Sequence, residues 1–556
     1  MHEKKKNTAG QDPPWHTDCG RKNVTKEALV KINRWRVAVL SAVILSLSVG
    51  LSHAADVQAL GAKPDGKTLC TAAIQKAIDD TAAAGGGTVT LPPGTWLSGT
   101  LRLKSHVRLH LEAGATLLGS TDLKDYPEIV PAVRSYTDNY VNRSLIAGED
   151  LDDVALTGRG TIDGNGAAYP GKQYLNRPFV IRLVNCRDVL VEGLRLRASP
   201  MWMQEYLACD RVRIRGLTVF NHSPNVYNND GLDIDGCRDV TVSDCVIDSD
   251  DDGICLKSTL DRPCENVTVT NCVISSHCNA FKTGTESTGG FKNIVFSNSA
   301  IFSPRYSKNV CGTLRGHAGI ALESVDGGVL DGVAVSNVTI EGVNVPIFLR
   351  LGNRARPFKK GAPKPGPSTL RNVSISHIVA RGMGGIGCAI AGLPGNRIEN
   401  VSLTDIQLAF EGGGKAEDAS RAIEERPEAY PESRMFGDLP AYGFYVRHAK
   451  GVKFSNVRVV TDKPDSRHAV VFDDAADVVL DGLDAAWSPG AAALLRMTGV
   501  DGALVRGCRP QAAGGTFLKA EGATKRIALL ANDFRDVAKS FEAPAGAVAE
   551  QGNLTK

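Results

Sequence analysis

Short stretches in which hydrophobic and polar residues alternate recur along most of the chain. From residue 151 onward an eleven-residue phrase returns thirteen times, for example as "CRDVTVSDCVI" at 237 and "CENVTVTNCVI" at 264. Most copies place Val or Ile at the fourth position and another hydrophobic residue at the sixth, then Gly, Asn or Asp and a second alternating pair. This pattern predicts a strand, a bend and a second strand.

The spacing of the phrases selects the fold class. Where the spacing is tight the phrases start at positions 186, 209, 237, 264 and 291. A single unit of this size cannot bury its own apolar face, whereas stacked units can. Helical repeats are excluded because the units lack a 3.6-residue period, and propeller blades need four strands in roughly 40 to 45 residues. The sequence therefore predicts an all-β protein, a single-stranded right-handed parallel β-helix.

A helical pattern precedes the repeats. The segment "TAAIQKAIDDTAAAGGG", which starts at Thr71, is rich in alanine, places Ile74 and Ile78 one helical turn apart and ends in glycines. These features predict a short N-terminal helix. Such a helix can cover the open end of the stack, which otherwise presents an unpaired strand edge.

Charge and hydropathy indicate which functions are not supported and where in the cell the protein is expected. Segment 1–54 carries nine Lys and Arg against four Asp and Glu, and the remainder carries 55 against 57, so a near-neutral body gives no support to nucleic-acid binding. Arg34 and Arg36 precede an apolar run, residues 37 to 51, which has the pattern of a secretory signal. The run is shorter than the ~20 residues of a membrane span. We expect cleavage near Ala54 and a secreted or periplasmic protein.

The thirteen cysteines would usually indicate disulfides in an exported chain. The spacing from Cys237 to Cys264 equals that from Cys245 to Cys272, so each pair is expected to stack on adjacent coils. Adjacent strands are about 4.8 Å apart, which leaves a bridge geometrically possible. We favour free thiols that pack as small hydrophobic residues.

The most acidic stretch, "DSDDDGICLKS" at 248 to 258, resembles the opening of a calcium loop. Asp248, Asp250, Asp252 and Gly253 fit that opening, but the twelfth position, which requires a bidentate Glu, is Thr259. The flanking segments are short β-branched runs instead of helices. A calcium hand is therefore not expected.

A second acidic stretch, "NNDGLDIDG", lies one coil earlier. Asp230 precedes Asp251 and Asp252 by about one coil, so the three carboxylates are predicted to stack on one outer face. Neighbouring negative charges raise one another's pKa values. One carboxyl group can then remain protonated as a general acid while others stay ionised and activate water, as in glycoside hydrolysis, where inverting enzymes separate the two groups by about 6.5 to 9.5 Å.

Alternation after the two acidic turns predicts which side chains face outward. Leu232 and Ile234 take the inner parity, whereas Asp233 and Asp235 take the outer parity. By the same rule Ile254 and Leu256 point in and Lys257 points out.

From Pro200 to Ser258 the sequence resembles glycoside hydrolase family 28, the polygalacturonase family, in "SPMWMQEYLACDRVRIRGLTV", "NNDGLDID" and "DDGICLKS". The resemblance extends more loosely over most of the chain after the signal. It implies a pectin-lyase-like solenoid that hydrolyses an α-linked, galacturonic acid-containing glycan with inversion. By this likeness Asp251 is the general acid, Asp230 and Asp252 hold and activate the water, and Asn228 belongs to the N-x-D-G motif.

Two other motifs of that family are altered. Asn279 stands at the position of the family's histidine and Lys282 at that of its serine, while Ala321 and Glu323 replace the R-I-K cations that grip galacturonate carboxylates. A carboxylate in place of a cation would repel galacturonate. A mixed pectin such as a rhamnogalacturonan, or an exo mode of attack, is therefore as plausible as the cleavage of plain polygalacturonate.

Several cations lie near enough in the sequence to restore the lost charge, although each by itself is expected to be a surface charge. They are Lys257, Lys282, Arg315, Arg350 and Arg354. His317, in "LRGHAGIALES", is a candidate replacement for the missing histidine or a simple loop residue. The substrate-binding candidates are Asn228, Lys257, Asn279, Lys282, His317, Glu323 and Arg350.

The charged, proline-rich segment 411 to 440 breaks the phrase rhythm and is either a wall of the substrate cleft or a plain insertion. The predicted division is a signal region 1–54, a cap with the first coils 55–140, catalytic coils 141–410, a loop insertion 411–441, C-terminal coils 442–540 and a tail 541–556.

Two other functions remain open: a polysaccharide lyase that uses calcium on the aspartates, and a non-catalytic glycan-binding solenoid. The hydrolase hypothesis requires no cofactor or metal and predicts a pectic polysaccharide or oligosaccharide as the partner of a monomer. It predicts no nucleic-acid partner, and no membrane contact after the signal is removed.

Overall fold

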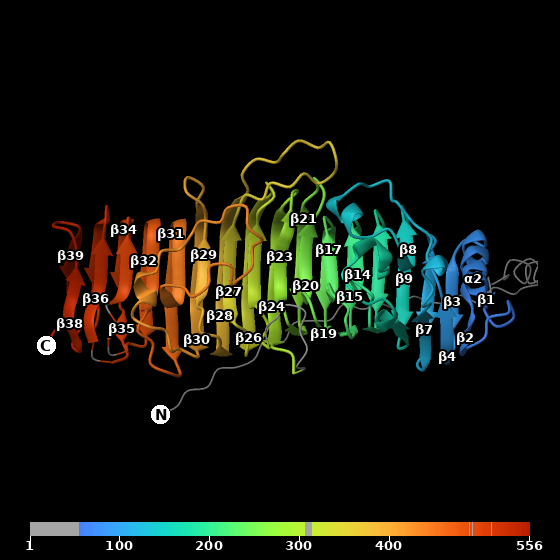
Figure 1. Ribbon diagram of the computed structural model, residues 1–556, viewed down its shortest axis with the longest axis horizontal. Helices are drawn as coiled ribbons and strands as arrows, with labels where there is room; N and C mark the ends of the chain where they lie inside the picture. Colours follow the sequence, from blue (N-terminus) through green and yellow to red (C-terminus); the bar gives the residue numbers. More distant parts are fainter. Residues whose placement is uncertain (1–54, 306–313, 489, 492, 513) are drawn as a thin grey trace, which may run out of the picture. The chain divides into compact units, whose positions relative to one another are not determined.

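The computed structural model describes residues 55–305, 314–488, 490–491, 493–512 and 514–556. The predicted signal region lies outside the described residues. Over the described residues the chain winds into a right-handed parallel β-helix, which confirms the predicted fold class, and the ladders between these strands are parallel. Figure 1 shows the coils stacked along one axis, with α2 (Thr71–Ala83) beside the first strands and β39 (Val548–Gln551) at the other end. No described helix is long and apolar enough to cross a membrane.

Each coil contributes strands to three parallel sheets. The sheet that carries the acidic stretches, here called the site sheet, comprises β5 (Leu101–Arg102), β8 (Ser144–Glu149), β11 (Phe179–Val184), β14 (Gln204–Leu207), β17 (Leu232–Asp235), β20 (Ile254–Ser258), β23 (Asn279–Ser287), β25 (Ala318–Ser324), β27 (Val345–Leu351), β29 (Cys388–Ala391), β33 (Ala493–Thr498), β36 (Gly514–Glu521) and β38 (Val537–Glu542).

The second sheet contains the first half of each repeated phrase and the third sheet contains the second half. The second comprises β1 (Ala55–Asp56), β3 (Gly87–Leu91), β6 (Val107–Leu111), β9 (Asp152–Gly158), β12 (Arg187–Glu192), β15 (Asp210–Arg215), β18 (Arg238–Ser243), β21 (Cys264–Thr270), β34 (Asp501–Arg506), β37 (Lys525–Leu530) and β39. The third comprises β2 (Asp65–Leu69), β4 (Gly94–Ser98), β7 (Ala115–Gly119), β10 (Thr161–Asp163), β13 (Arg195–Arg197), β16 (Thr218–Asn221), β19 (Val246–Ser249), β22 (Val273–Ser276) and β35 (Arg509–Pro510).

Toward the C-terminal end the strands lengthen and continue from one sheet into the next. Strands that span the second and third sheets are β24 (Phe291–Phe302), β26 (Val329–Glu341), β28 (Thr369–Met383) and β30 (Ile398–Phe410), and those that span all three are β31 (Ala441–Thr461) and β32 (His468–Ala485). Short 3-10 turns occur at η1 (Leu123–Asp125), η2 (Tyr136–Asn139), η3 (Gly166–Ala168), η4 (Tyr174–Asn176) and η5 (Asp418–Ser420).

The bends between the sheets explain the polar positions of the phrase. In the phrase at 237 the third and eighth residues, Asp239 and Asp244, have φ of 57° and 59°, and in the next phrase Asn266 and Asn271 have φ of 57° and 55°. Asn and Asp adopt this left-handed region more readily than other non-glycine residues. The polar residues at these phrase positions are therefore requirements of the bend and carry no sign of chemistry.

The register confirms the stacking predicted from the repeat. Val240 pairs with Val267 and Val246 with Val273, and the same offset along the chain places Cys237 beneath Cys264. These cysteines, like Cys245 and Cys272, are buried free thiols, as predicted. Cys278, in contrast, is disulfide-bonded.

The helix predicted from Thr71 is confirmed, and Ile74 and Ile78 are fully buried in the main core at the start of the stack. The segment between β30 and β31, residues 411–440, contains no strand and packs on the outside of the site sheet, where Leu439 joins a small core cluster with Phe348. Residues 541–556, predicted as a tail, still add β39 to the stack.

Candidate active site

The three predicted aspartates converge at the entrance to two neighbouring strands. Asp230 precedes β17 and the pair Asp251 and Asp252 precedes β20. Because Leu232 pairs with Ile254, Asp230 lies next to Asp252 in the stack. One carboxylate oxygen of each aspartate lies within 4.8 Å of the others. This spacing is shorter than the wide gap expected between two carboxyl groups of an inverting enzyme.

Glycines directly after the aspartates allow this approach. A Cβ atom added to Gly231 would lie 2.7 Å from the carbonyl oxygen of Gly253, and one added to Gly253 would lie 2.6 Å from the carbonyl oxygen of Ala280. Such distances are too short for a side chain, so glycine is required where the coils pass each other. The D-G step of both motifs is thus a packing requirement that brings the carboxylates together.

The environment separates the protonation states of the adjacent aspartates. Burial, together with the negative charge of Asp252, raises the pKa of Asp251 to about 6. Burial by itself would also raise the pKa of Asp252, but the charges of Lys282 and Lys257 outweigh it and hold that pKa below its usual value. A proton donor and an ionised carboxylate therefore lie side by side, which is the arrangement that general acid–base catalysis needs.

Asp252 is held by two residues of the next coil. Asn279 Nδ2 donates a hydrogen bond of 2.8 Å to Asp252 Oδ1, and Lys282 Nζ donates one of 3.0 Å to Oδ2. These contacts fix both oxygens of the carboxylate. Asn279 and Lys282, predicted as substrate-binding residues, thus contact the neighbouring carboxylate directly.

Asp230 belongs to a buried cluster in which one lysine lies near three carboxylates. Lys257 Nζ lies 3.4 Å from Asp233, 3.7 Å from Asp230 and 3.8 Å from Glu286. Burial, reinforced by the charges of Asp233 and Asp251, raises the pKa of Asp230 well above its usual value. Lys257 therefore provides the positive charge that makes three close acids tolerable in this part of the pocket.

The turn that precedes Asp251 is anchored through Asp250. His277 Nδ1 lies 2.8 Å and His222 Nδ1 3.1 Å from Asp250 Oδ1, and the Nε2 atom of His222 lies 2.9 Å from Asp248. Burial opposes ionisation of Asp250, but the hydrogen bonds from His222 and His277 lower its pKa. This cluster fixes the backbone from which Asp251 and Asp252 project.

Aromatic side chains surround the carboxylates in a cavity of about 130 Å³. Trp202 lies beneath Lys257, with the amine 4.4 Å from the ring centroid, and contacts Tyr140 and Phe179. Tyr430, from the 411–440 segment, also lines the cavity, and its hydroxyl lies 3.4 Å from Lys282 Nζ. Aromatic faces beside carboxylates suit a sugar ring, which presents C–H groups and hydroxyls together.

The other predicted binding residues divide between the pocket and the interior. Asn228 lines the cavity and its side-chain oxygen accepts a hydrogen bond from Arg177. Glu323 is fully buried behind the cavity, 4.0 Å from Lys282, and burial raises its pKa well above the usual value. His317 is buried beside Glu432, with Nδ1 3.0 Å from the carboxylate. Neither Glu323 nor His317 lines the cavity.

Arg350 also lies outside the cavity. Its guanidinium is buried, donates hydrogen bonds to main-chain carbonyls of the 411–440 segment, including that of Glu425 at 2.7 Å, and lies 5.2 Å from the ring of Phe436. In this position it fastens the segment to the site sheet. Arg354 lies 5.1 Å from the ring of Tyr430, and both Arg354 and Arg315 are half-buried.

The expectation that these cations are surface charges was wrong for three of them. Lys257, Lys282 and Arg350 are only 4%, 1% and 2% exposed. The outward-facing Asp233 and Asp235 are also fully buried. The reason is that irregular segments pack on the outer face of the site sheet, where Tyr140 of segment 120–143 contacts Glu286 and Tyr430 of segment 411–440 contacts Lys282. Alternation within one strand cannot reveal such contacts.

Several residues of the site were not identified from the sequence. They are Tyr140, Tyr174, Met201, Trp202, Glu286 and Tyr430. Met201 and Trp202 lie inside the stretch that carries the family resemblance, so their place in that stretch could have identified them as candidates. Tyr140 and Tyr430 come from irregular segments distant in sequence, and only their isolated aromatic character within polar loops could have drawn attention to them.

Comparison with curated proteins identifies relatives of the same kind. A probable polygalacturonase from Vitis vinifera is 34% identical over 261 residues, which cover 40% of this chain and 52% of the relative. An exo-poly-alpha-D-galacturonosidase from Dickeya chrysanthemi is 41% identical over 114 residues, 19% of this chain and 18% of the relative. The chain thus spans about half the length, or less, of these curated relatives.

Solved structures share the fold. An exopolygalacturonase from Thermotoga maritima superposes with a TM-score of 0.57 at 21% identity, covering 74% of this chain and 92% of that chain. The family 28 exopolygalacturonase of Yersinia enterocolitica gives a TM-score of 0.56 at 19% identity, with coverage of 77% and 78%. A family model described as glycosyl hydrolases family 28 matches residues 84–418. The stacked coils, the aspartate cluster and this match together show that the chain belongs to glycosyl hydrolase family 28.

Proposed function

We propose that this glycosidase is an exported, exo-acting hydrolase of galacturonic acid-containing pectic glycans that inverts the anomeric configuration. The observation that carries the proposal is the convergence of Asp230, Asp251 and Asp252 in one small, aromatic-walled cavity of a family 28 chain. The secretory pattern that precedes Ala54 supports export.

The proposed chemistry divides the work among the three aspartates. Asp251, with its pKa raised to about 6, protonates the glycosidic oxygen as the bond to the anomeric carbon breaks. Asp252, held ionised by Lys282, removes a proton from the attacking water, and Asp230 helps to hold that water. Water attacks the face opposite the leaving group, so the released sugar has the inverted configuration. Asp230 and Asp252 position the water together, and this shared role accounts for the short distance between these two carboxylates.

The walls of the cavity support an exo mode of attack. Tyr140, from the segment between β7 and β8, and Tyr430, from the segment between β30 and β31, both line it. Loops that bring side chains over the site sheet from both directions along the stack favour a pocket for a chain end over an open groove. The relatives named exopolygalacturonase and exo-poly-alpha-D-galacturonosidase are consistent with this proposal.

The charges that line the cavity affect which sugar it accepts. Four carboxylates, Asp230, Asp251, Asp252 and Glu286, line the cavity, with Lys257 as its single lining cation among the described residues. This balance favours an uncharged sugar, or one whose carboxylate points away, at the reaction centre. A mixed pectin such as a rhamnogalacturonan therefore stays beside polygalacturonate as a proposed substrate.

The test is a product assay on polygalacturonate, rhamnogalacturonan and defined pectic oligosaccharides, with the anomeric configuration followed by NMR. We expect single residues or short units from the chain end and an inverted anomer in the first product. A retained anomer would contradict the inverting mechanism. An unsaturated product that absorbs in the ultraviolet, with activity lost on chelation, would support the lyase alternative, which the family match does not favour.

A further inference from the structure

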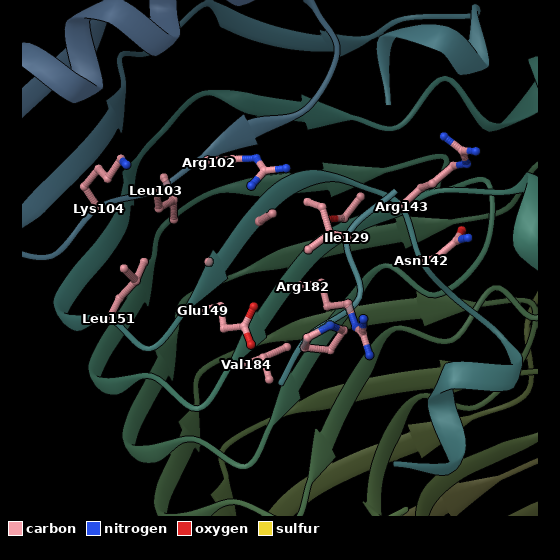
Figure 2. Close-up of a pocket in the computed structure, with 14 residues that line it drawn as sticks. Arg102, Leu103, Lys104, Ile129, Asn142, Arg143, Glu149, Leu151, Arg182 and Val184 are labelled. Carbon is pink, nitrogen blue, oxygen red and sulfur yellow. The ribbon is translucent and has the colours of Figure 1, made fainter. Parts of the chain in front are cut away.

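A second pocket lies on the site sheet, several coils before the catalytic cavity. Its volume is about 190 Å³. Figure 2 shows Arg102, Lys104 and Arg143 along one side of this pocket and Glu149 and Arg182 along the other. Nothing in the proposed reaction uses these residues.

The strand register shows that this pocket and the catalytic aspartates share one face. Arg102 pairs with Ala147, Ala147 with Arg182, Arg182 with Glu205, and Glu205 with Asp233. Residues that follow one another in this way project from the same side of a parallel sheet. Four steps of about 4.8 Å separate Arg102 from Asp233, or roughly 19 Å along the stack.

The segment between β7 and β8 separates the two pockets. Pro131 lines the second pocket, whereas Tyr140 lines the catalytic cavity. Between them Thr137 accepts a hydrogen bond of 3.1 Å from Arg182. The second pocket is therefore a distinct site beside the catalytic cavity and is not its continuation.

The second pocket is basic, whereas the catalytic cavity is acidic. Its lining contains four cations, Arg102, Lys104, Arg143 and Arg182, and one acid, Glu149. A cleft lined by one sign of charge raises the local concentration of the opposite ion. An anionic ligand is therefore favoured in this pocket.

Arg102 is the cation of this pocket that is free to bind a ligand. Arg182 pairs with Glu205 at 2.6 Å, Arg143 with Glu128 at 2.7 Å, and Lys104 lies 3.7 Å from an exposed aspartate. Within the described residues the exposed Arg102 guanidinium makes neither a hydrogen bond nor an ion pair. Its planar fork matches the two oxygens of a carboxylate.

The remaining lining suits a sugar better than a bare ion. The apolar members of the pocket are Leu103, Ile129, Pro131, Ala147, Leu151 and Val184. Apolar walls with a few polar groups that fix orientation are typical of sites for small organic ligands. A uronate unit presents both a carboxylate and a C–H surface.

We propose that this pocket is an ancillary binding site for a uronate unit of the glycan polymer, with Arg102 as the group that binds its carboxylate. The inference rests on the proposed function only in taking that polymer as the substrate. A polymer held at this site has its chain ends at an increased effective concentration near the catalytic cavity. The site would thus act on long substrates by tethering them.

The test measures the binding of polygalacturonate to the full chain carrying Asp251→Asn, which silences cleavage. Adding Arg102→Ala is expected to weaken binding about tenfold, the effect of losing one charge-assisted hydrogen bond. Arg108→Ala is the matched control because Arg108 is also an exposed arginine but lies on β6, in the second sheet. It should change the affinity less than twofold. Carboxyl-reduced polygalacturonate should bind equally to both forms of residue 102.

Three results would overturn the inference. One is equal binding of polygalacturonate with and without Arg102→Ala. Another is an equal loss for the carboxyl-reduced polymer, because the effect would then not depend on the carboxylate. The third is Arg102-dependent binding of inorganic phosphate with no effect on the polymer, which would indicate a site for free anions. Absence of hydrolysis by the unmodified chain would contradict the proposed function alone, because the binding measurement does not require cleavage.

Discussion

Two acid–base pairs between adjacent coils show how differently one geometry can behave in this molecule. On the second sheet Asp188 pairs with Arg211 at 2.7 Å, with both side chains 50% exposed. On the site sheet Asp252 pairs with Lys282 at 3.0 Å, with the side chains 5% and 1% exposed. Both pairs arise from the same stacking of coils. Only the second is removed from water.

Burial changes what such a pair does. The pKa of Asp188 is lowered chiefly by its hydrogen bond to Arg211, in solvent that screens the charge. At the site, burial opposes ionisation of every acid, so a lysine decides which carboxylate stays charged. Asp251, which has no such direct contact with Lys282, keeps a raised pKa of about 6. The buried pair therefore gives the neighbouring aspartates different pKa values, whereas the exposed pair is only a surface ion pair.

The largest effect on activity is expected when the buried acids of the site are replaced. We expect Asp251→Asn and Asp252→Asn each to lower kcat by about 10² to 10⁴, the usual contribution of a general acid or base. Steady-state rates on a substrate identified by the product assay provide the measurement. Asp188→Asn is the control and should leave kcat within twofold. Folded Asp251→Asn and Asp252→Asn variants with full activity on all pectic substrates would sink the proposed mechanism.

The next effect in size concerns the pH dependence of activity, both in the unmodified enzyme and in a variant without the buried Lys282. The unmodified enzyme should lose activity as pH rises through about 6, because Asp251 then loses the proton it donates. The acid limb of its profile should lie below the ordinary pKa of an aspartate, because the charges of Lys282 and Lys257 hold the pKa of Asp252 below that value.

Lys282→Met should raise the pKa of Asp252 and so shift the acid limb to higher pH, with kcat lowered about tenfold. The pH dependence of kcat/KM reports this shift. Lys292→Met, at an exposed position of β24, is the matched control. An acid limb that does not move in Lys282→Met would mean that this lysine does not keep Asp252 ionised.

The smallest effect is expected at the exposed pair. Arg211→Ala should lower the urea concentration at the midpoint of unfolding only slightly and leave the pH dependence of activity unchanged. Urea unfolding of the unmodified and variant chains measures the difference. A loss well above the range typical of exposed ion pairs would show that the surface ladder contributes more to the stack than the contrast between the two pairs implies.

The sequence was sufficient to predict the coil and the clustering of the three aspartates, because both depend on local rules. Alternation with Asn, Asp and Gly at the bends predicts the stacked coil, and the constant offset between phrases places Cys237 beneath Cys264, as the register confirms. The same counting predicted that Asp230, Asp251 and Asp252 would stack on one outer face, and one carboxylate oxygen of each lies within 4.8 Å of the others.

The tertiary structure decided the surroundings of those groups. Whether an outward residue meets water depends on segments 120–143 and 411–440, which are distant in sequence and follow no period. These segments bury Lys257 and Lys282, bring Tyr140 and Tyr430 to the carboxylates and withdraw Arg350 into a structural contact. Periodicity within a coil determines the direction of a side chain, but its dielectric environment, and hence its pKa, depends on the whole fold.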